Sequence, residues 1–227
     1  IISEDSNFQN SSLGIFDNFF NTGSPNNFGQ SLSVNYVLPF QYFPFLNFIE
    51  GTYTYTGNFN WERGSDVFSS IKSEGGEILG RVNTIQNANT QNFLLNFNFN
   101  QIYREIPWLN SDENILKSLI KSTRRVRFNY SENSGKVLPG FLPSIGFLGT
   151  SKPSLGFVFG SQSDIRYEAA KNGWLTDFPT FNESFKQIFN SKFDLLGELE
   201  FFQIIKLDLN ANRSYSNNFT ENYRVDN

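Results

Sequence analysis

Residues 52–62 read Thr-Tyr-Thr-Tyr-Thr-Gly-Asn-Phe-Asn-Trp-Glu, and this stretch decides the fold class. Its odd positions carry aromatic residues and one glycine: Tyr53, Tyr55, Gly57, Phe59 and Trp61. Its even positions carry small, uncharged polar residues: Thr52, Thr54, Thr56, Asn58 and Asn60. Because successive side chains point to opposite faces of a β-strand, this alternation predicts a strand whose two faces meet different environments.

The same two-residue period recurs along the rest of the chain. It is found in 31–38, 92–100, 125–130, 154–160, 194–201, 207–212 and 219–225. These stretches predict an all-β fold of about eight antiparallel strands, several of them about ten residues long or more. Ordinary globular strands have about five or six residues, whereas a tilted strand that crosses a bilayer needs roughly 9–11. Strand length therefore favours the wall of an outer-membrane β-barrel over a soluble β-sandwich, whose strands alternate in the same way.

In a barrel wall, one face of every strand meets lipid and the other meets the lumen. We therefore predict that the aromatic positions face lipid: Tyr53, Tyr55, Phe59, Trp61, Phe97 and Phe99. The polar positions are predicted to face the lumen: Thr52, Thr54, Thr56, Asn58, Asn60, Asn96, Asn98 and Asn100.

The segments between the predicted strands divide the chain. Residues 1–30, rich in Asn, Ser and Gly, are expected to form a loop or extended segment, and 31–227 one stretch of barrel wall. Short helices are expected in two loop inserts, near 105–122 and 161–187. Ser111 is the expected N-cap of a helix at 112–122, and Asp164 and Gly173 the expected ends of a helix at 164–172. A third helix is expected near 182–188.

Four residues outside the strands are candidate contacts with a partner or with the barrel rim. Pro107 and Trp108 belong to an apolar cluster that follows a strand, and either anchor the chain at a membrane interface or form a tight apolar turn. Phe141 lies in the apolar Gly- and Pro-rich stretch 138–149, expected to be a plug, a partner contact or a loop packed on the rim. Trp174 lies in the second insert, expected to form an ordered extracellular cap that narrows the exit or meets a partner, or to pack only on its own strands.

Composition excludes several classes of function. The 227 residues include no Cys and no His, which excludes disulfides, a cysteine nucleophile, histidine metal ligands and a Ser-His-Asp triad. The net charge of −4 gives no electrostatic reason to expect nucleic acid. The first residue is Ile1, which favours a processed chain or a piece of a longer one. Paired carboxylates such as Glu198 and Glu200 are interpreted as polar-face residues, so no enzyme activity, metal or cofactor is expected.

Several segments taken together resemble the SprA/Sov family, the outer-membrane translocon of the type IX secretion system, which also serves gliding motility. They are Thr-Ile-Gln-Asn at 84–87, Ile-Pro-Trp-Leu at 106–109, Leu-Pro-Gly-Phe-Leu-Pro at 138–143, Gly-Trp-Leu-Thr at 173–176 and Asn-Phe-Thr-Glu-Asn-Tyr-Arg-Val at 218–225. The resemblance runs from about residue 29 to 227. It implies a giant single-chain barrel with a protein-conducting pore and no catalytic residues, of which this chain would be one stretch of wall. It also implies two alternating partners, a PorV-type shuttle barrel of the outer membrane and a periplasmic plug component.

The leading hypothesis is therefore a non-enzymatic part of an outer-membrane channel that passes secreted cargo proteins. One alternative is a small-solute porin or nutrient-receptor barrel, which differs in lumen size and loops. A second alternative is a soluble β-sandwich at the cell surface that binds glycans through aromatic residues. A sandwich would turn its aromatic residues inward against a second sheet.

Overall fold

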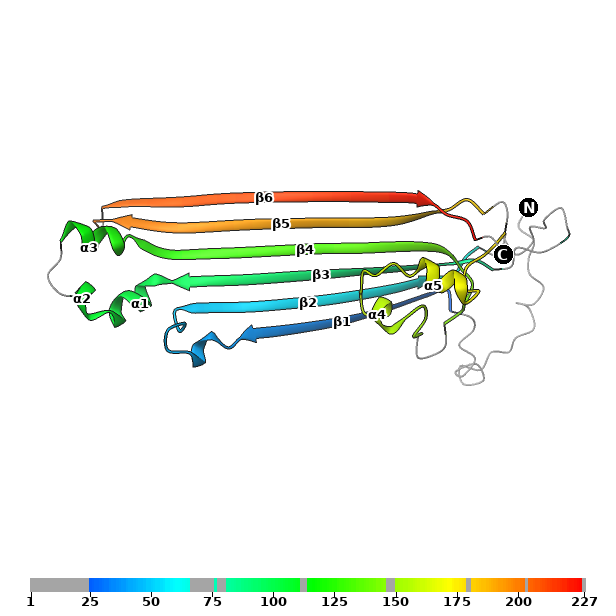
Figure 1. The fold of residues 1–227 in the computed structure, drawn as a ribbon, viewed down its shortest axis with the longest axis horizontal. Helices are drawn as coiled ribbons and strands as arrows, with labels where there is room; N and C mark the ends of the chain where they lie inside the picture. Colours follow the sequence, from blue (N-terminus) through cyan, green and yellow to red (C-terminus); the bar gives the residue numbers. More distant parts are fainter. Residues whose placement is uncertain are drawn as a thin grey trace, which may run out of the picture.

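Six long strands form one antiparallel sheet in the computed structural model, and they follow each other across the sheet in chain order (Figure 1). The structure describes residues 25–65, 76, 81–110, 114–145, 150–178, 181–202 and 204–225. The strands are β1 (Asn27–Leu38), β2 (Ile49–Glu62), β3 (Asn83–Asn98), β4 (Thr123–Phe141), β5 (Ser184–Phe201) and β6 (Ile205–Asn222). This arrangement confirms the predicted all-β, antiparallel character. The sheet is open in this part of the chain, with β1 and β6 at its edges.

Short helices occupy the connections between the strands. They are η2 (Phe40–Tyr42), α1 (Phe99–Glu105), α2 (Pro107–Asn110), α3 (Ile115–Ile120), α4 (Leu155–Val158) and α5 (Arg166–Lys171). Figure 1 shows η2 and α1–α3 at one end of the sheet, and α4 and α5 at the opposite end. In the chain, α4 and α5 belong to the connection from β4 to β5. None of the helices in the described ranges is long and apolar enough to cross a membrane.

The strands are fewer and longer than the sequence predicts, at 12 to 19 residues each. Two predicted strands, 207–212 and 219–225, belong to the single strand β6. The predicted strand at 154–160 is wrong, because Ser154 accepts a hydrogen bond from the amide of Phe157 and caps α4 there. Strand β1 also begins earlier than expected, at Asn27, so 27–30 are not loop, while 1–24 lie outside the described residues.

The predicted helices are confirmed in two places and corrected in the third. Helix α3 lies within the predicted 112–122, but its N-cap is Asn114, whose side chain accepts from the amide of Lys117; Ser111 lies outside the described residues. Helix α5 ends as predicted, with Gly173 at a φ of +66° after the last helical turn. Its N-cap is Ile165 and not the predicted Asp164, whose carboxylate accepts from the amide of Arg166. The helix predicted near 182–188 is wrong, because β5 begins at Ser184.

The pairing register sorts the side chains of all six strands onto two faces. We call the face that carries Thr52, Thr54 and Thr56 the polar face, and the face that carries Tyr53 and Tyr55 the aromatic face. Each strand lies in a fixed register with the next, so the alternation of β2 is carried across the sheet. The predicted strand Phe93–Asn100 ends at Asn98, so Phe99 and Asn100 lie in α1 and on neither face.

A segment between β4 and β5 packs on one end of the aromatic face. We call its described residues, 142–145, 150–178 and 181–183, the insert. Together with the sheet it forms the main hydrophobic core, whose fully buried members are Phe59, Ile85, Leu138, Phe141, Phe157, Val158, Ile165 and Phe185. The ring of Phe59 on β2 meets that of Phe157 in the insert edge to face, with centroids 6.2 Å apart.

Candidate functional site

The polar face is an uncharged surface of hydroxyls and amides over much of β1 to β4. Thr54 donates to the Asn35 side chain at 2.9 Å, and Thr90 donates to Asn133 at 2.7 Å, each from one strand to the next. The predicted lumen-facing positions of β2 lie on this face, as do Asn96 and Asn98 of β3. Hydrogen bonds between neighbouring side chains satisfy these groups while leaving the surface open.

Charged residues of the polar face gather toward the end that carries α1–α3. There Glu50, Arg125, Arg127 and Glu198 line a pocket of about 400 Å³. The register brings Arg125 opposite Glu198. The polar face therefore has a neutral stretch and, toward one end, a stretch where both signs of charge are mixed.

The aromatic face carries two zones besides the core beneath the insert, and we call the first of them the apolar band. Its members lie in rows across the strands, in the half of the sheet toward α1–α3. The first row holds Tyr36, Tyr53, Phe93, Tyr130 and Phe193, and the second holds Leu38, Leu95, Phe128, Leu195 and Ala211. The third row holds Phe97, Val126 and Leu209, and the fourth Leu199 and Leu207. Aromatic rings interlock within it; the Phe128 centroid lies 5.0 Å from that of Phe193 and 6.2 Å from that of Phe93.

The second zone is richer in polar residues, although it shares the aromatic face, and we call it the polar stripe. It comprises three rows whose polar members include Gln30, Asn87, Asn89, Gln91, Glu132, Ser134, Lys136, Gln187 and Ser191, and which also hold the apolar Leu32, Val34, Phe59, Phe189 and Phe219. The insert covers its central part. Asn87 donates to the carbonyl oxygens of Phe157 at 3.0 Å and Ser161 at 2.7 Å, and Asn89 donates to that of Gly160 at 2.8 Å. These side chains satisfy insert carbonyls that would otherwise be buried without a donor.

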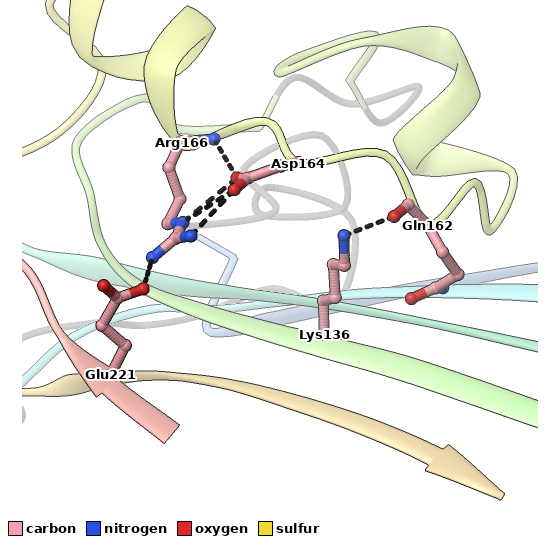
Figure 2. A network of polar contacts seen from close by, with 5 residues as sticks. All are labelled: Lys136, Gln162, Asp164, Arg166 and Glu221. Carbon is pink, nitrogen blue, oxygen red and sulfur yellow. Dashed lines mark hydrogen bonds and ion pairs between the residues drawn. The ribbon is translucent and has the colours of Figure 1, made fainter. Parts of the chain in front are cut away.

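Lys136 of β4 is the charged member of this buried contact. Its residue is 3% exposed, and its ammonium donates to the carbonyl oxygen of Gln162 (Figure 2). The Gln162 side chain in turn donates to Asn87 at 3.2 Å. The insert is thus held to the sheet by a connected polar network and not by apolar packing alone.

Two glycines allow the insert and the sheet to approach backbone to backbone. A Cβ atom at Gly57 would lie 2.1 Å from the carbonyl oxygen of Phe159, and one at Gly160 would lie 2.9 Å from the Cα of Gly57. Gly160 also has a φ of +94°, which favours glycine. Beside this contact, the hydroxyl of Tyr55 donates to the same Phe159 carbonyl at 2.6 Å.

An ionic clasp ties the insert to the edge strand. Arg166 lies between Asp164, 2.8 Å away, and Glu221 of β6, 2.5 Å away, as Figure 2 shows. Its guanidinium also lies 4.3 Å above the centre of the Phe185 ring. Hydrogen bonding to Arg166 holds the pKa of the Asp164 carboxyl below its usual value, and the two carboxylates raise the pKa of the guanidinium.

The structure corrects the predicted lipid-facing set at one end of β2. Phe59 and Trp61 are each 2% exposed and belong to the core beneath the insert, so they do not face lipid. Tyr55 lies at the edge of the insert, with its hydroxyl bonded to it. Tyr53 and Phe97 lie in the apolar band. The sequence alternates regularly through all these positions, and the alternation itself does not show that a distant segment covers some of them.

The predictions that Phe99 faces lipid and that Asn100 faces the lumen are wrong as well, because both residues lie in α1 and not in the strand. The ring of Phe99 stacks on Phe97, with centroids 6.3 Å apart. The Asn100 side chain accepts from Arg124 at 2.9 Å. The apolar band is therefore extended by an aromatic ring from a helix, and Asn100 serves a local contact instead of lining the polar face.

The four candidate contact residues fall at opposite ends of the sheet. Pro107 and Trp108 are exposed in α2, at the same end as α1 and α3 (Figure 1). Phe141 is 1% exposed in the core, where it packs on the sheet and offers no surface to a partner. Its stretch 138–141 is the end of β4 and not a loop. Trp174 packs beside this core, with the ammonium of Lys152 5.3 Å from its ring centre.

The described part of the insert packs on the sheet, yet it does not lie over the polar face. Its contacts are with the aromatic face of β2, β3 and β4, through Gly57, Asn87 and Lys136. The residues that make this contact were not identified from the sequence. One signal was present: on β3 the positions that continue the parity of Phe93 are Gln91, Asn89 and Asn87, which breaks the apolar pattern.

Neither the protein-family models nor the curated proteins include a match to this chain.

Proposed function

We propose that this chain is a stretch of the wall of an outer-membrane β-barrel, and specifically of the protein-conducting channel of type IX secretion. The observation that carries the membrane part of this proposal is the separation of the sheet into a polar face and a face with an apolar band. The resemblance to the SprA/Sov family supports the narrower function. On that basis the localisation is the outer membrane, and the partners are secreted cargo, a PorV-type shuttle barrel and a periplasmic plug component.

The dimensions of the apolar band support a membrane-spanning wall. On β5 the aromatic-face positions from Phe193 to Phe201 are all apolar or glycine. At a rise of about 3.3 Å per residue this stretch is on the order of 26 Å long, close to the roughly 25 Å apolar belt of outer-membrane barrels. The strands continue beyond the band into the polar stripe, so each is longer than the membrane requires.

The edges of the sheet support its membership of a larger closed sheet. Strand β6 is exposed at every one of its 18 residues, and its outer backbone groups face no strand within the described ranges. A long, regular edge strand without bulges or a covering segment invites pairing with another chain. Closure by further strands beyond β1 and β6 removes both edges, as in all barrels.

The polar face supplies the chemistry that a protein-conducting lumen needs. Hydroxyls and amides such as those of Thr54, Asn92 and Ser131 hydrogen-bond to a polypeptide backbone with modest strength and without charge preference. The insert packs on the other face, so it leaves the polar face free along the whole sheet. Transport by such a wall is physical, and no residue of this chain is assigned a chemical step.

Photocrosslinking in cells tests this function and separates it from solute uptake. A photoreactive amino acid at Thr54 is expected to capture a secreted cargo protein arrested in transit, whereas the same group at Tyr53 is expected to capture none because that side chain faces lipid. Both positions are adjacent on β2, so a difference in capture between them cannot be caused by a difference in depth along the strand, and each variant controls for the expression of the other. Capture at neither position, together with uptake of small solutes that depends on this chain, would replace the proposal with the porin alternative.

A further inference from the structure

Helix α3 exposes its apolar side and half-buries its polar side. Its exposed positions are apolar: Ile115 is 69%, Leu116 70%, Leu119 45% and Ile120 46% exposed. Its polar residues Lys117 and Ser118 and the following Lys121 are half-buried. A helix on the surface of a water-soluble protein shows the reverse arrangement, with its apolar stripe turned to the core.

The position of α3 ties this exposed apolar surface to the apolar band. The carbonyl oxygen of Ser122, two residues after the helix, accepts from the amide of Glu200 at 2.6 Å. Glu200 lies next to Phe201, the last aromatic-face residue of the band on β5. Phe202 and Ile204, in the adjacent turn, are also exposed. The outward face of α3 therefore lies at the level where the apolar band ends.

We infer that α3 is an interfacial membrane anchor, whose Ile115, Leu116, Leu119 and Ile120 enter the boundary between lipid headgroups and acyl chains. The occupant is the lipid bilayer itself, because the exposed apolar residues of α3 lie at the level where a band of membrane thickness ends. Helices of this kind lie in the interface with their apolar face buried roughly 5–10 Å into it. Half-buried lysine side chains suit this place, since their stems pack on apolar groups while the ammonium reaches water.

The inference rests on the proposed membrane-wall function, and depth-dependent fluorescence quenching tests the two separately. The chain contains no cysteine, so Leu119→Cys, Leu195→Cys and Thr54→Cys each offer one labelling site. Each labelled full-length chain is reconstituted into phosphatidylethanolamine–phosphatidylglycerol vesicles. The quenchers are iodide in water and lipids that carry a nitroxide either near the headgroup or near the end of the acyl chain.

The expected result is a different quencher for each position. Fluorescence at Leu119 is lost most with the shallow nitroxide, at Leu195 with the deep nitroxide, and at Thr54 with iodide. Leu116→Cys, on the same side of α3, repeats the measurement if the Leu119 variant folds poorly.

Two outcomes overturn the inference while leaving the wall intact. Quenching of Leu119 by iodide alone, with Leu195 still quenched by lipid, places α3 in water. Quenching of Leu119 by no agent places its apolar face against protein. If Leu195 is also insensitive to both lipid quenchers, the proposed membrane wall fails, and the anchor fails with it.

Discussion

Individual residues on β2 and β3 decide where the insert docks. Gly57 removes the side chain at the point where the insert backbone approaches, and Asn87 supplies two donors beside it. Both positions belong to the aromatic face, where alternation alone predicts a bulky apolar residue. The docking contact therefore depends on residues that break the local pattern, and each of them offers a direct test.

Gly57→Ala is expected to dislodge the insert. The new methyl would lie 2.1 Å from the Phe159 carbonyl oxygen, so backbone must shift, at a typical cost of about 1–3 kcal/mol. Limited proteolysis is expected to cut the insert faster in this variant than in the parent. Gly197→Ala is the matched control, since its Cβ would lie 3.7 Å from the nearest atom, the Leu209 Cβ. Equal protection of the insert in both variants would contradict the close approach.

Asn87→Ala is expected to destabilise the same contact through its polar network. The substitution removes the donors to the Phe157 and Ser161 carbonyls, and each buried group left unpaired costs roughly 1–3 kcal/mol. Hydrogen exchange of residues 156–162 is expected to accelerate. Asn92→Ala serves as the control, because Asn92 lies on the same strand but on the open polar face. This variant is expected to change the exchange of residues 156–162 little. A similar acceleration in both variants would show that Asn87 has no special role.

At the scale of whole elements, strand existence and face parity could be predicted, but strand extent and the insert could not. Alternation at 52–62 depends on local residues alone, and the register carries it across the sheet. The stretch at 154–160 alternates equally well, yet Ser154 caps α4 and the turn buries Phe157 against Phe59. Two-residue alternation over seven residues does not distinguish a strand from a segment shaped by a distant contact.

The clasp between the insert and β6 is expected to weaken in acid. Arg166 lowers the pKa of Asp164 from the usual 3.8, so the folded state binds a proton on this group less readily than the unfolded chain. Its contribution is therefore fully present above the unfolded pKa and is lost as the pH falls through the lower folded value. The protection of the α5 amides against hydrogen exchange, expressed relative to the intrinsic exchange rate at each pH, is expected to be high at neutral pH and to fall in that acidic range. Asp164→Asn is expected to abolish this pH dependence, and an unchanged profile in that variant would exclude the clasp as its cause.

Adjacent leucines on β5 compare the two faces directly. Leu195 lies in the apolar band and Leu196 on the polar face. Arginine at Leu195 is expected to destabilise the membrane-folded state by roughly 2–4 kcal/mol, the cost near a bilayer midplane. Arginine at Leu196 is expected to cost far less because that side chain faces water. A membrane-folding titration measures both variants, and equal costs would refute the assignment of faces.

At the scale of the whole molecule, the insert and the polar face occupy opposite sides of the sheet. Residues that pack the insert, such as Phe59 and Trp61, belong to the aromatic face, whereas Thr54 and Asn92 remain uncovered on the other. In a barrel whose polar face lines the lumen, the insert therefore lies outside the wall, beyond the apolar band. This placement argues against a cap that narrows the exit. It instead gives the insert the role of a stabilising outer segment and leaves the polar face as an open inner surface.

On the proposed channel function, removal of the insert is expected to leave the channel equally wide. Deletion of 150–178 removes most of the insert. Phe59→Thr and Trp61→Thr are combined with it to reduce the apolar surface that the deletion uncovers. Single-channel conductance of the assembled barrel in planar bilayers is expected to stay unchanged, because no insert contact described above involves the polar face. The temperature of unfolding is expected to fall, since the core on the aromatic face is lost. The two threonine substitutions alone provide the control for stability. A clear rise in conductance after the deletion would mean that the insert restricts the lumen, and the outward assignment of the aromatic face at this end of the sheet would then be wrong.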